Sequence, residues 1–185
     1  MTAREIGATA NLSQGGLSLI TDQMSPSACL DALETQALYE DAVRFLAHKL
    51  PARGAIEWAV KCVRELEAPD RRQRPNEPLE AAETWLLAPS DATRQAARQA
   101  ADRSPDKSAS TLVAMAVYFS GGSITQPGQP EVQPPPYSAA KMAGGAVRIS
   151  VVSYDPPHTA ERYRRALALG RQFDAGLPTE PKAAR

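Results

Sequence analysis

The sequence predicts an all-α protein, a compact bundle of seven or eight short, mostly antiparallel helices joined by proline-rich loops. Apolar residues recur with a helical period through most of residues 26–176. The 16 prolines gather mainly between these periodic stretches, where they end helices. A chain of 185 residues can also bury roughly 70% of its unfolded surface, so a core without disulfides or metals is expected.

Three regions differ in composition. Residues 1–25 are rich in Thr, Ser, Gly and Ala, with one weak apolar cluster, and are predicted to be a loosely ordered N-terminal arm. Residues 26–176 carry the periodic stretches and form the single helical domain. Residues 177–185 begin with Leu177-Pro178 and are predicted to be a flexible tail.

Capping residues and prolines delimit the first two helices of the domain. Ser25 is a preferred N-cap and Pro26 fits the first position of a helix that ends near Leu33. Thr35 is then expected to cap a second helix. Pro51 ends that helix, because proline disfavours helical geometry in the residue before it.

The following helix, residues 53–67, is predicted to be central in the packing. Trp58 and Cys62 widen its apolar stripe until most of its circumference is apolar. Residues 68–78 hold three prolines and a basic run and are predicted to form a surface loop.

Three further helices are predicted at residues 79–87, 90–103 and 108–119. The second has only alanines on its apolar side, so it can approach a neighbour closely but buries little area, and it is expected at the periphery. A Gly-Gly pair supplies the left-handed turn that ends the third. Residues 125–136 contain five prolines and are predicted to be an extended loop.

Residues 138–154 show both the alternation of a strand and the spacing of a helix. Their length favours a helix, and a lone strand would lack a partner elsewhere in the chain. Gly144 and Gly145 then allow close helix contact, at about 1 kcal/mol each relative to alanine. The last helix is expected to start with Asp155 as its cap and Pro156 at its first position.

The residue types that carry chemistry are few and scattered. Cys29, His48, Cys62 and His158 lack the closely spaced pair typical of structural zinc sites. Both cysteines lie among apolar residues on predicted helix faces, where a thiolate is disfavoured. His48, near the end of its helix, is expected to act as a favourable dipole partner when protonated.

No nucleophile elbow or phosphate-binding glycine loop occurs, and the carboxylate pairs lie in charged, exposed stretches. The sequence therefore predicts no catalytic, cofactor-binding or metal-ligating residue, no cofactor, and no enzyme.

The charge balance excludes several classes of partner. Lys plus Arg number 21, as do Asp plus Glu, so no global field would hold a nucleic acid or an anionic bilayer. The longest apolar stretch, residues 112–119, is too short to span a membrane. We expect a cytoplasmic protein without membrane insertion or a nucleic-acid partner.

Two local basic clusters and one proline motif are candidate contacts with a partner protein. One cluster lies in the predicted loop and the other on the last helix, and an ordinary solvated surface is the alternative for both. The segment Pro134-Pro135-Pro136-Tyr137 matches proline-rich peptides that aromatic grooves bind, but it also fits a stiff connector whose tyrosine packs back on the domain. The candidate contacts are Arg71, Arg72, Arg74, Tyr137, Arg162 and Arg165.

Five short motifs between about residues 29 and 176 carry a resemblance to a known family. They are Leu50-Pro51-Ala52-Arg53 leading into Ile56-Glu57-Trp58-Ala59, Ala81-Ala82-Glu83-Thr84-Trp85, Tyr118-Phe119-Ser120-Gly121-Gly122-Ser123, Pro134-Pro135-Pro136-Tyr137, and Ala160-Glu161-Arg162-Tyr163 with Leu167-Ala168-Leu169-Gly170. Together they resemble a family of small, functionally uncharacterised bacterial proteins.

Members of that family look like companions of type VI secretion genes, near spike-tip proteins, toxic effectors and the adaptor chaperones that load them. The resemblance implies a non-catalytic adaptor or co-chaperone that binds a secretion adaptor chaperone or an effector. One alternative is a small helical-bundle enzyme or ligand-binding protein, whose sign would be a deep pocket near Cys62, His48 or Trp58. Another is an immunity protein for a toxin. The oligomeric state stays open.

Overall fold

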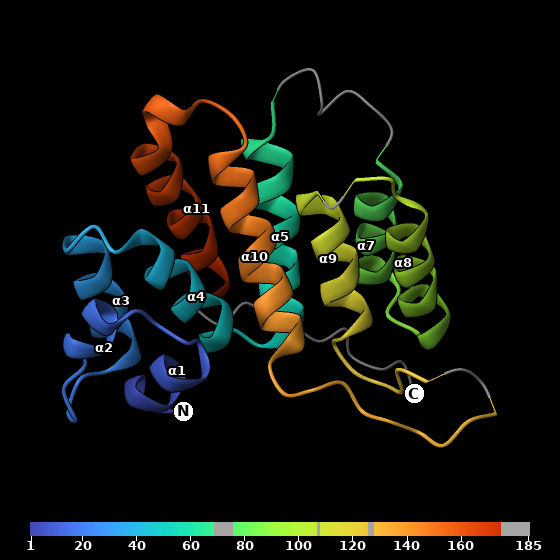
Figure 1. Cartoon of the computed structure of the whole chain (residues 1–185), viewed down its shortest axis with the longest axis horizontal. Coiled ribbons are helices and arrows are strands. Elements are labelled where there is room, and N and C mark those ends of the chain that lie inside the picture. The colour runs from blue at the N-terminus through green and yellow to red at the C-terminus, as the bar shows by residue number, and fades with distance from the viewer. Residues whose placement is uncertain (69–75, 107, 126–127, 175–185) are drawn as a thin grey trace.

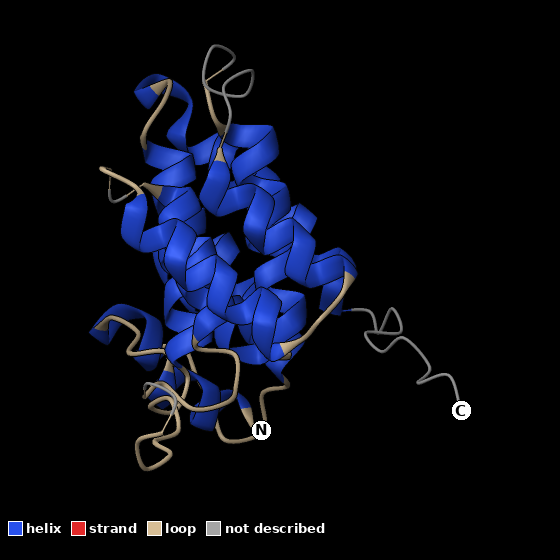
Figure 2. Cartoon of the chain, turned by 90° about the vertical axis from the view of Figure 1, so that its right-hand side faces the viewer, coloured by secondary structure: helices blue, strands red, loops and turns tan. Residues whose placement is uncertain are grey.

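The computed structural model describes residues 1–68, 76–106, 108–125 and 128–174. Within these ranges the chain consists of helices and loops, and no strand is present (Figures 1 and 2). The all-α prediction is confirmed. The elements of the structure, in chain order, are α1 (Ala3–Thr9), α2 (Gln14–Ser18), α3 (Pro26–Thr35), α4 (Tyr39–Lys49), α5 (Ala52–Leu66), α7 (Glu77–Leu87), α8 (Asp91–Arg103), α9 (Ala109–Tyr118), α10 (Ser138–Val152), the 3-10 turn η1 (Pro156–His158) and α11 (Thr159–Asp174).

Helices α5 and α10 occupy the centre of the bundle (Figure 1). Helix α10 contacts α4, α5, α9 and α11, whereas α8 contacts α7 and α9 at the outer edge. The central place predicted for α5 and the peripheral place predicted for the alanine-faced α8 are both confirmed. One cluster of buried apolar residues extends from α1 to α11.

Small residues let α10 approach two neighbours at once. A methyl group on Gly144 would lie 3.1 Å from the Cβ of Ala47 on α4. One on Gly145 would lie 3.2 Å from the Cδ1 of Leu112 on α9. The glycine pair therefore serves the close helix contact that the sequence predicted.

Trp58 joins α5 to α11. Its side chain is fully buried, and its indole Nε1 donates a hydrogen bond of 2.7 Å to the carbonyl oxygen of Ala166. One turn further along α11, Gly170 leaves room for the ring: a methyl group there would lie 2.8 Å from Trp58 Cε2 and 2.6 Å from Leu46 Cδ2. The largest core side chain thus fits only because its neighbour has no side chain.

The prediction of a loosely ordered arm over residues 1–25 is wrong. Helices α1 and α2 form there, capped by the side chains of Thr2 and Ser13, and Ile6 is only 2% exposed. Helices of five and seven residues are too short to show an apolar period, so the sequence gave little sign of them.

Two predicted N-caps are also wrong. Thr35 is the last residue of α3, where its hydroxyl donates to the carbonyl of Asp31, and α4 starts beyond it without a side-chain cap. Asp155 has a left-handed φ of 58° and pairs with His158 across η1, which precedes α11. The predicted tail, residues 177–185, lies outside the described residues.

Gly170→Ala is expected to lower the free energy of unfolding by about 1–2 kcal/mol. The added methyl overlaps Trp58 and Leu46, and the cost of overpacking exceeds the gain in helix propensity. Gly54→Ala in α5 is the matched control, because its nearest atoms are 3.9 Å from the new methyl; it should stabilise by up to about 1 kcal/mol. Urea denaturation measures both, and equal effects would contradict this account of Gly170.

Candidate functional site

The cysteines and histidines are not brought together. Cys29 and Cys62 are fully buried, and burial raises the pKa of both thiols, which disfavours the nucleophilic thiolate. Among the described residues no group of three or more His, Cys, Asp or Glu side chains is placed to hold a metal ion.

His48 lies in α4 beside a cavity of about 400 Å³. The side chain is 4% exposed, and its Nδ1 donates to the carbonyl of Arg44 at 2.9 Å. Its Nε2 is buried without a hydrogen-bond partner in the described part of the chain. Burial lowers the pKa of His48, which disfavours the protonated form on which the expected contact with the helix dipole depends.

Tyr137 packs back on the domain at the start of α10. Its ring centroid is 5.6 Å from that of His48, and its hydroxyl reaches the sulfur of Met1 at 3.7 Å. The prolines before it line the same cavity. The segment thus has the position expected of a stiff connector, although the tyrosine remains 40% exposed.

The basic candidates differ in what they contact. Arg162 donates to the carbonyls of Val151, Ser150 and Leu66, which are orphaned at the ends of α10 and α5. Arg165 pairs with Glu65 on the surface. The remaining candidates, Arg71, Arg72 and Arg74, lie outside the described residues.

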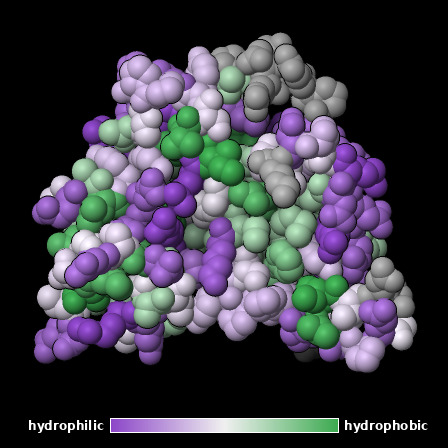
Figure 3. Space-filling model, viewed as in Figure 1, coloured by the Kyte–Doolittle hydropathy of each residue, from purple (hydrophilic) through white to green (hydrophobic). Residues whose placement is uncertain are grey.

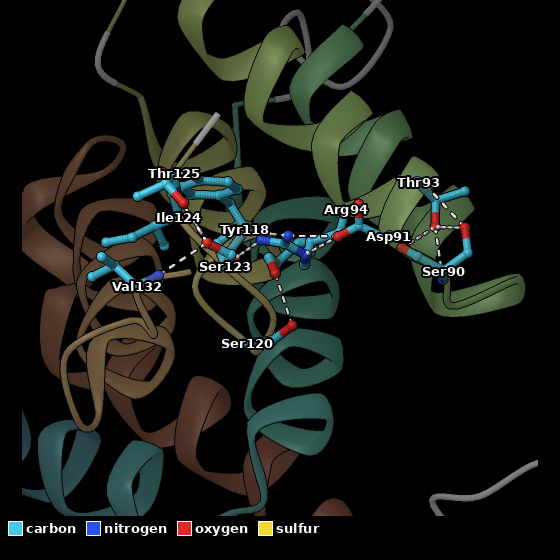
Figure 4. A network of polar contacts seen from close by, with 11 residues as sticks. Ser90, Asp91, Thr93, Arg94, Tyr118, Ser120, Ser123, Ile124, Thr125 and Val132 are labelled. Carbon is cyan, nitrogen blue, oxygen red and sulfur yellow. Dashed lines mark hydrogen bonds and ion pairs between the residues drawn. The ribbon is translucent and has the colours of Figure 1, made fainter. Parts of the chain in front are cut away.

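Arg94 is a buried anchor that sequence reasoning missed (Figure 4). Its guanidinium, on α8, donates to the carbonyls of Tyr118 and Ser123 at 2.9 and 3.0 Å and pairs with Asp91 at 2.6 Å. Gly122, with a φ of 68°, leaves space for it, since a methyl group there would lie 2.8 Å from the Arg94 Nη2. The network fixes the turn after α9. In the sequence Arg94 stands among the alanines of α8, and that pattern does not indicate a buried arginine.

A family model described as "Family of unknown function (DUF6931)" matches residues 29–173. The chain belongs to this family. The DUF6931 region includes α4 to η1, most of α3 and all but the last residue of α11, and it leaves α1 and α2 outside. Searches of curated proteins and of solved structures gave no match. In the described residues, no helix has both the length and the apolar character needed to cross a bilayer.

Within the DUF6931 region, apolar side chains remain partly exposed where α9 and α10 lie side by side (Figure 3). On α10 they recur at helical spacing, and Val152 is 49% exposed. A hollow of about 390 Å³ opens at the Ile149 end, partly lined by Tyr154. We call this surface the α9–α10 face; its residues are Leu112, Met115, Met142, Ile149 and Val152.

The burial of His48 predicts a pH dependence of stability. Its folded pKa lies below the unfolded value of 6.5, so the unfolded chain takes up the proton first, and stability falls as pH drops below about 6.5. His48→Gln should flatten the fall in melting temperature between pH 7.5 and 5.5. His158 is the control: Asp155 raises its pKa, its contribution has the opposite sign, and His158→Gln should steepen the fall. An unchanged slope in His48→Gln would contradict the assignment.

The carbonyl contacts of Arg162 predict a structural role. Arg162→Ala should reduce the free energy of unfolding by about 1–3 kcal/mol, because buried carbonyls lose their donors. Arg165→Ala, which removes an exposed ion pair, should cost less than about 1 kcal/mol. If urea titrations give the two variants the same stability, Arg162 does not hold the helix ends.

Proposed function

We propose that this protein is a non-catalytic protein-binding module, with the α9–α10 face as its docking surface. The observation that carries the proposal is the row of partly exposed apolar side chains on two adjacent helices. Exposed apolar surface of this kind costs free energy in water and is covered when a partner helix packs on it.

The side chains of this face can adapt to partner surfaces of different shape. Met115 and Met142 contribute flexible, polarisable side chains that repack around different surfaces. Gly145 lies between Met142 and Ile149, and Leu112 of α9 packs over it, so the apolar side chains of the two helices form one continuous surface. Beside it, Arg148 pairs with Glu40, which provides the polar rim usual at protein interfaces.

We further propose that the partner belongs to a type VI secretion apparatus, as an adaptor chaperone or an effector. The family resemblance of the short motifs supports this identification, and the protein would then act in the cytoplasm as an adaptor or co-chaperone. The ion pairs of Arg64, Arg98, Arg165 and Arg171 support a protein partner over a nucleic acid, because a neighbouring carboxylate already neutralises each of these four side chains.

A second candidate function, binding of a small ligand, is favoured by one observation. The Nε2 of His48 is a buried acceptor with no hydrogen-bond partner among the described residues, beside a cavity that Leu50 and Phe119 make partly apolar. Such a site would suit a ligand that donates one hydrogen bond from an otherwise apolar body.

Val152→Asp tests the docking surface. Co-expressed with the type VI adaptor chaperones and effectors of its host, the wild-type chain should co-purify with one of them. Val152→Asp should weaken that complex at least tenfold, because an aspartate in an apolar interface is buried without a partner. Val132→Asp is the matched control, since Val132 is equally exposed, at 47%, but lies in a loop away from this face; it should bind like wild type.

Circular dichroism establishes that both variants are folded. Failure of the wild-type chain to bind any secretion protein would overturn the secretion assignment. Equal binding by the two variants would overturn the assignment of the surface.

A further inference from the structure

We propose that α4 carries a second binding site, separate from the α9–α10 face, which recognises a short helix-starting turn in a partner protein. In this structure the chain's own residues 11–13, between α1 and α2, occupy the site. The site consists of Asp41, Arg44 and the apolar surface around them.

Asp41 supplies the first part of the recognition. Its side chain is buried, with the residue only 4% exposed, on the first turn of α4. It accepts a hydrogen bond of 3.0 Å from the backbone N–H of Ser13 and another from the Ser13 hydroxyl. A buried carboxylate is tolerated only when it is paired or hydrogen-bonded, and Ser13 of the occupant supplies both hydrogen bonds that Asp41 accepts here.

Arg44, one turn further along α4, supplies the second part. Its Nη1 donates to the carbonyl oxygen of Asn11 at 3.2 Å and lies 3.6 Å from the Asp41 carboxylate. Between the two polar contacts, Leu12 is buried and 6% exposed. The site thus contacts three consecutive residues of the occupant: the carbonyl of Asn11, the aliphatic side chain of Leu12, and Ser13, which caps the next helix.

The fit continues three residues beyond the serine. A methyl group on Gly16 would lie 2.6 Å from the Asp41 Oδ2, so only glycine lets the helix start approach the carboxylate. Gly15, next to it, is exposed, and its methyl would lie 3.6 Å or more from other atoms. The segment Asn11-Leu12-Ser13-Gln14-Gly15-Gly16 therefore defines the pattern of an acceptable occupant: an aliphatic residue, Ser or Thr, two further residues, then Gly.

The site and its occupant belong to different parts of the chain. Asp41 and Arg44 lie within the DUF6931 region, whereas residues 11–16 lie outside it. Helix α2 follows the occupant, and residues 19–25 connect α2 to α3. A partner segment with the same pattern can satisfy the same donors and acceptor, so the resident segment acts as its competitor.

The experiment uses the full-length chain with Gly16→Leu, whose own segment cannot seat against Asp41. A fluorescein-labelled peptide of residues 1–24 with the native sequence is titrated, and fluorescence anisotropy reports binding. The variant should bind the peptide at least tenfold more tightly than wild type, in which the resident segment fills the site. Gly15→Leu is the matched control and should behave like wild type, because its side chain faces solvent.

Two changes test the recognition itself. A labelled peptide with Ser13→Ala should bind Gly16→Leu at least tenfold more weakly than the native peptide, since the Asp41 carboxylate loses a donor. A peptide array varied at positions 12 and 13 should retain only aliphatic residues followed by Ser or Thr.

Circular dichroism and thermal melting show that the Gly16→Leu chain is folded. No binding by this folded variant would overturn the proposal. Binding unaffected by Ser13→Ala would also overturn it, because the contact would then be apolar and without the recognition argued here.

Discussion

The close approach of α10 to its neighbours is the constraint on which the rest of the structure depends. Its buried surface is almost entirely Ala, Gly, Ser and Val, so it contacts α4, α5, α9 and α11 at short range. Small residues bury little apolar area each, but they allow many backbone-level contacts. The bulky side chain at the α9–α10 contact is supplied by α9, since Leu112 lies over Gly145. The contact between α5 and α11 follows the same rule, since Trp58 of α5 lies against Gly170 of α11. Size is thus complementary across both central contacts.

Long side chains then fix the ends of the helices that this packing brings together. Helix ends leave carbonyl groups without partners, and a guanidinium with five donors can satisfy several at once. Arg162 does so for α5 and α10, and Arg94 for the turn after α9. Asp41 performs the converse task, accepting from the start of α2. These buried polar contacts specify register where alanine-rich faces alone would permit sliding.

The proposed function combines two surfaces of different character. The α9–α10 face is broad, apolar and adaptable, whereas the α4 site is narrow and depends on two hydrogen-bonding side chains. A module with one surface of each kind can hold one protein while it selects another by a short segment. This is the task of an adaptor, and it needs no reacting group. The buried His48, whose pKa is lowered by burial, is the feature that such a role does not use.

Sequence by itself determined the helical class, the ends of most helices and the central place of α5, because apolar period and proline position are local properties. It also indicated the close contact at Gly144 and Gly145. It could not show that Arg94 and Arg162 are buried anchors, since an arginine's partners are carbonyls distant in the chain, whose identity depends on how the helices pack. It missed α1 and α2 because helices of five to seven residues are too short to show an apolar period. The burial of Ile6 and the hydrogen bonds of Ser13 also depend on tertiary packing, which the sequence does not show. The α4 site was decided by tertiary structure alone, because its donors and its acceptor are 28 residues apart.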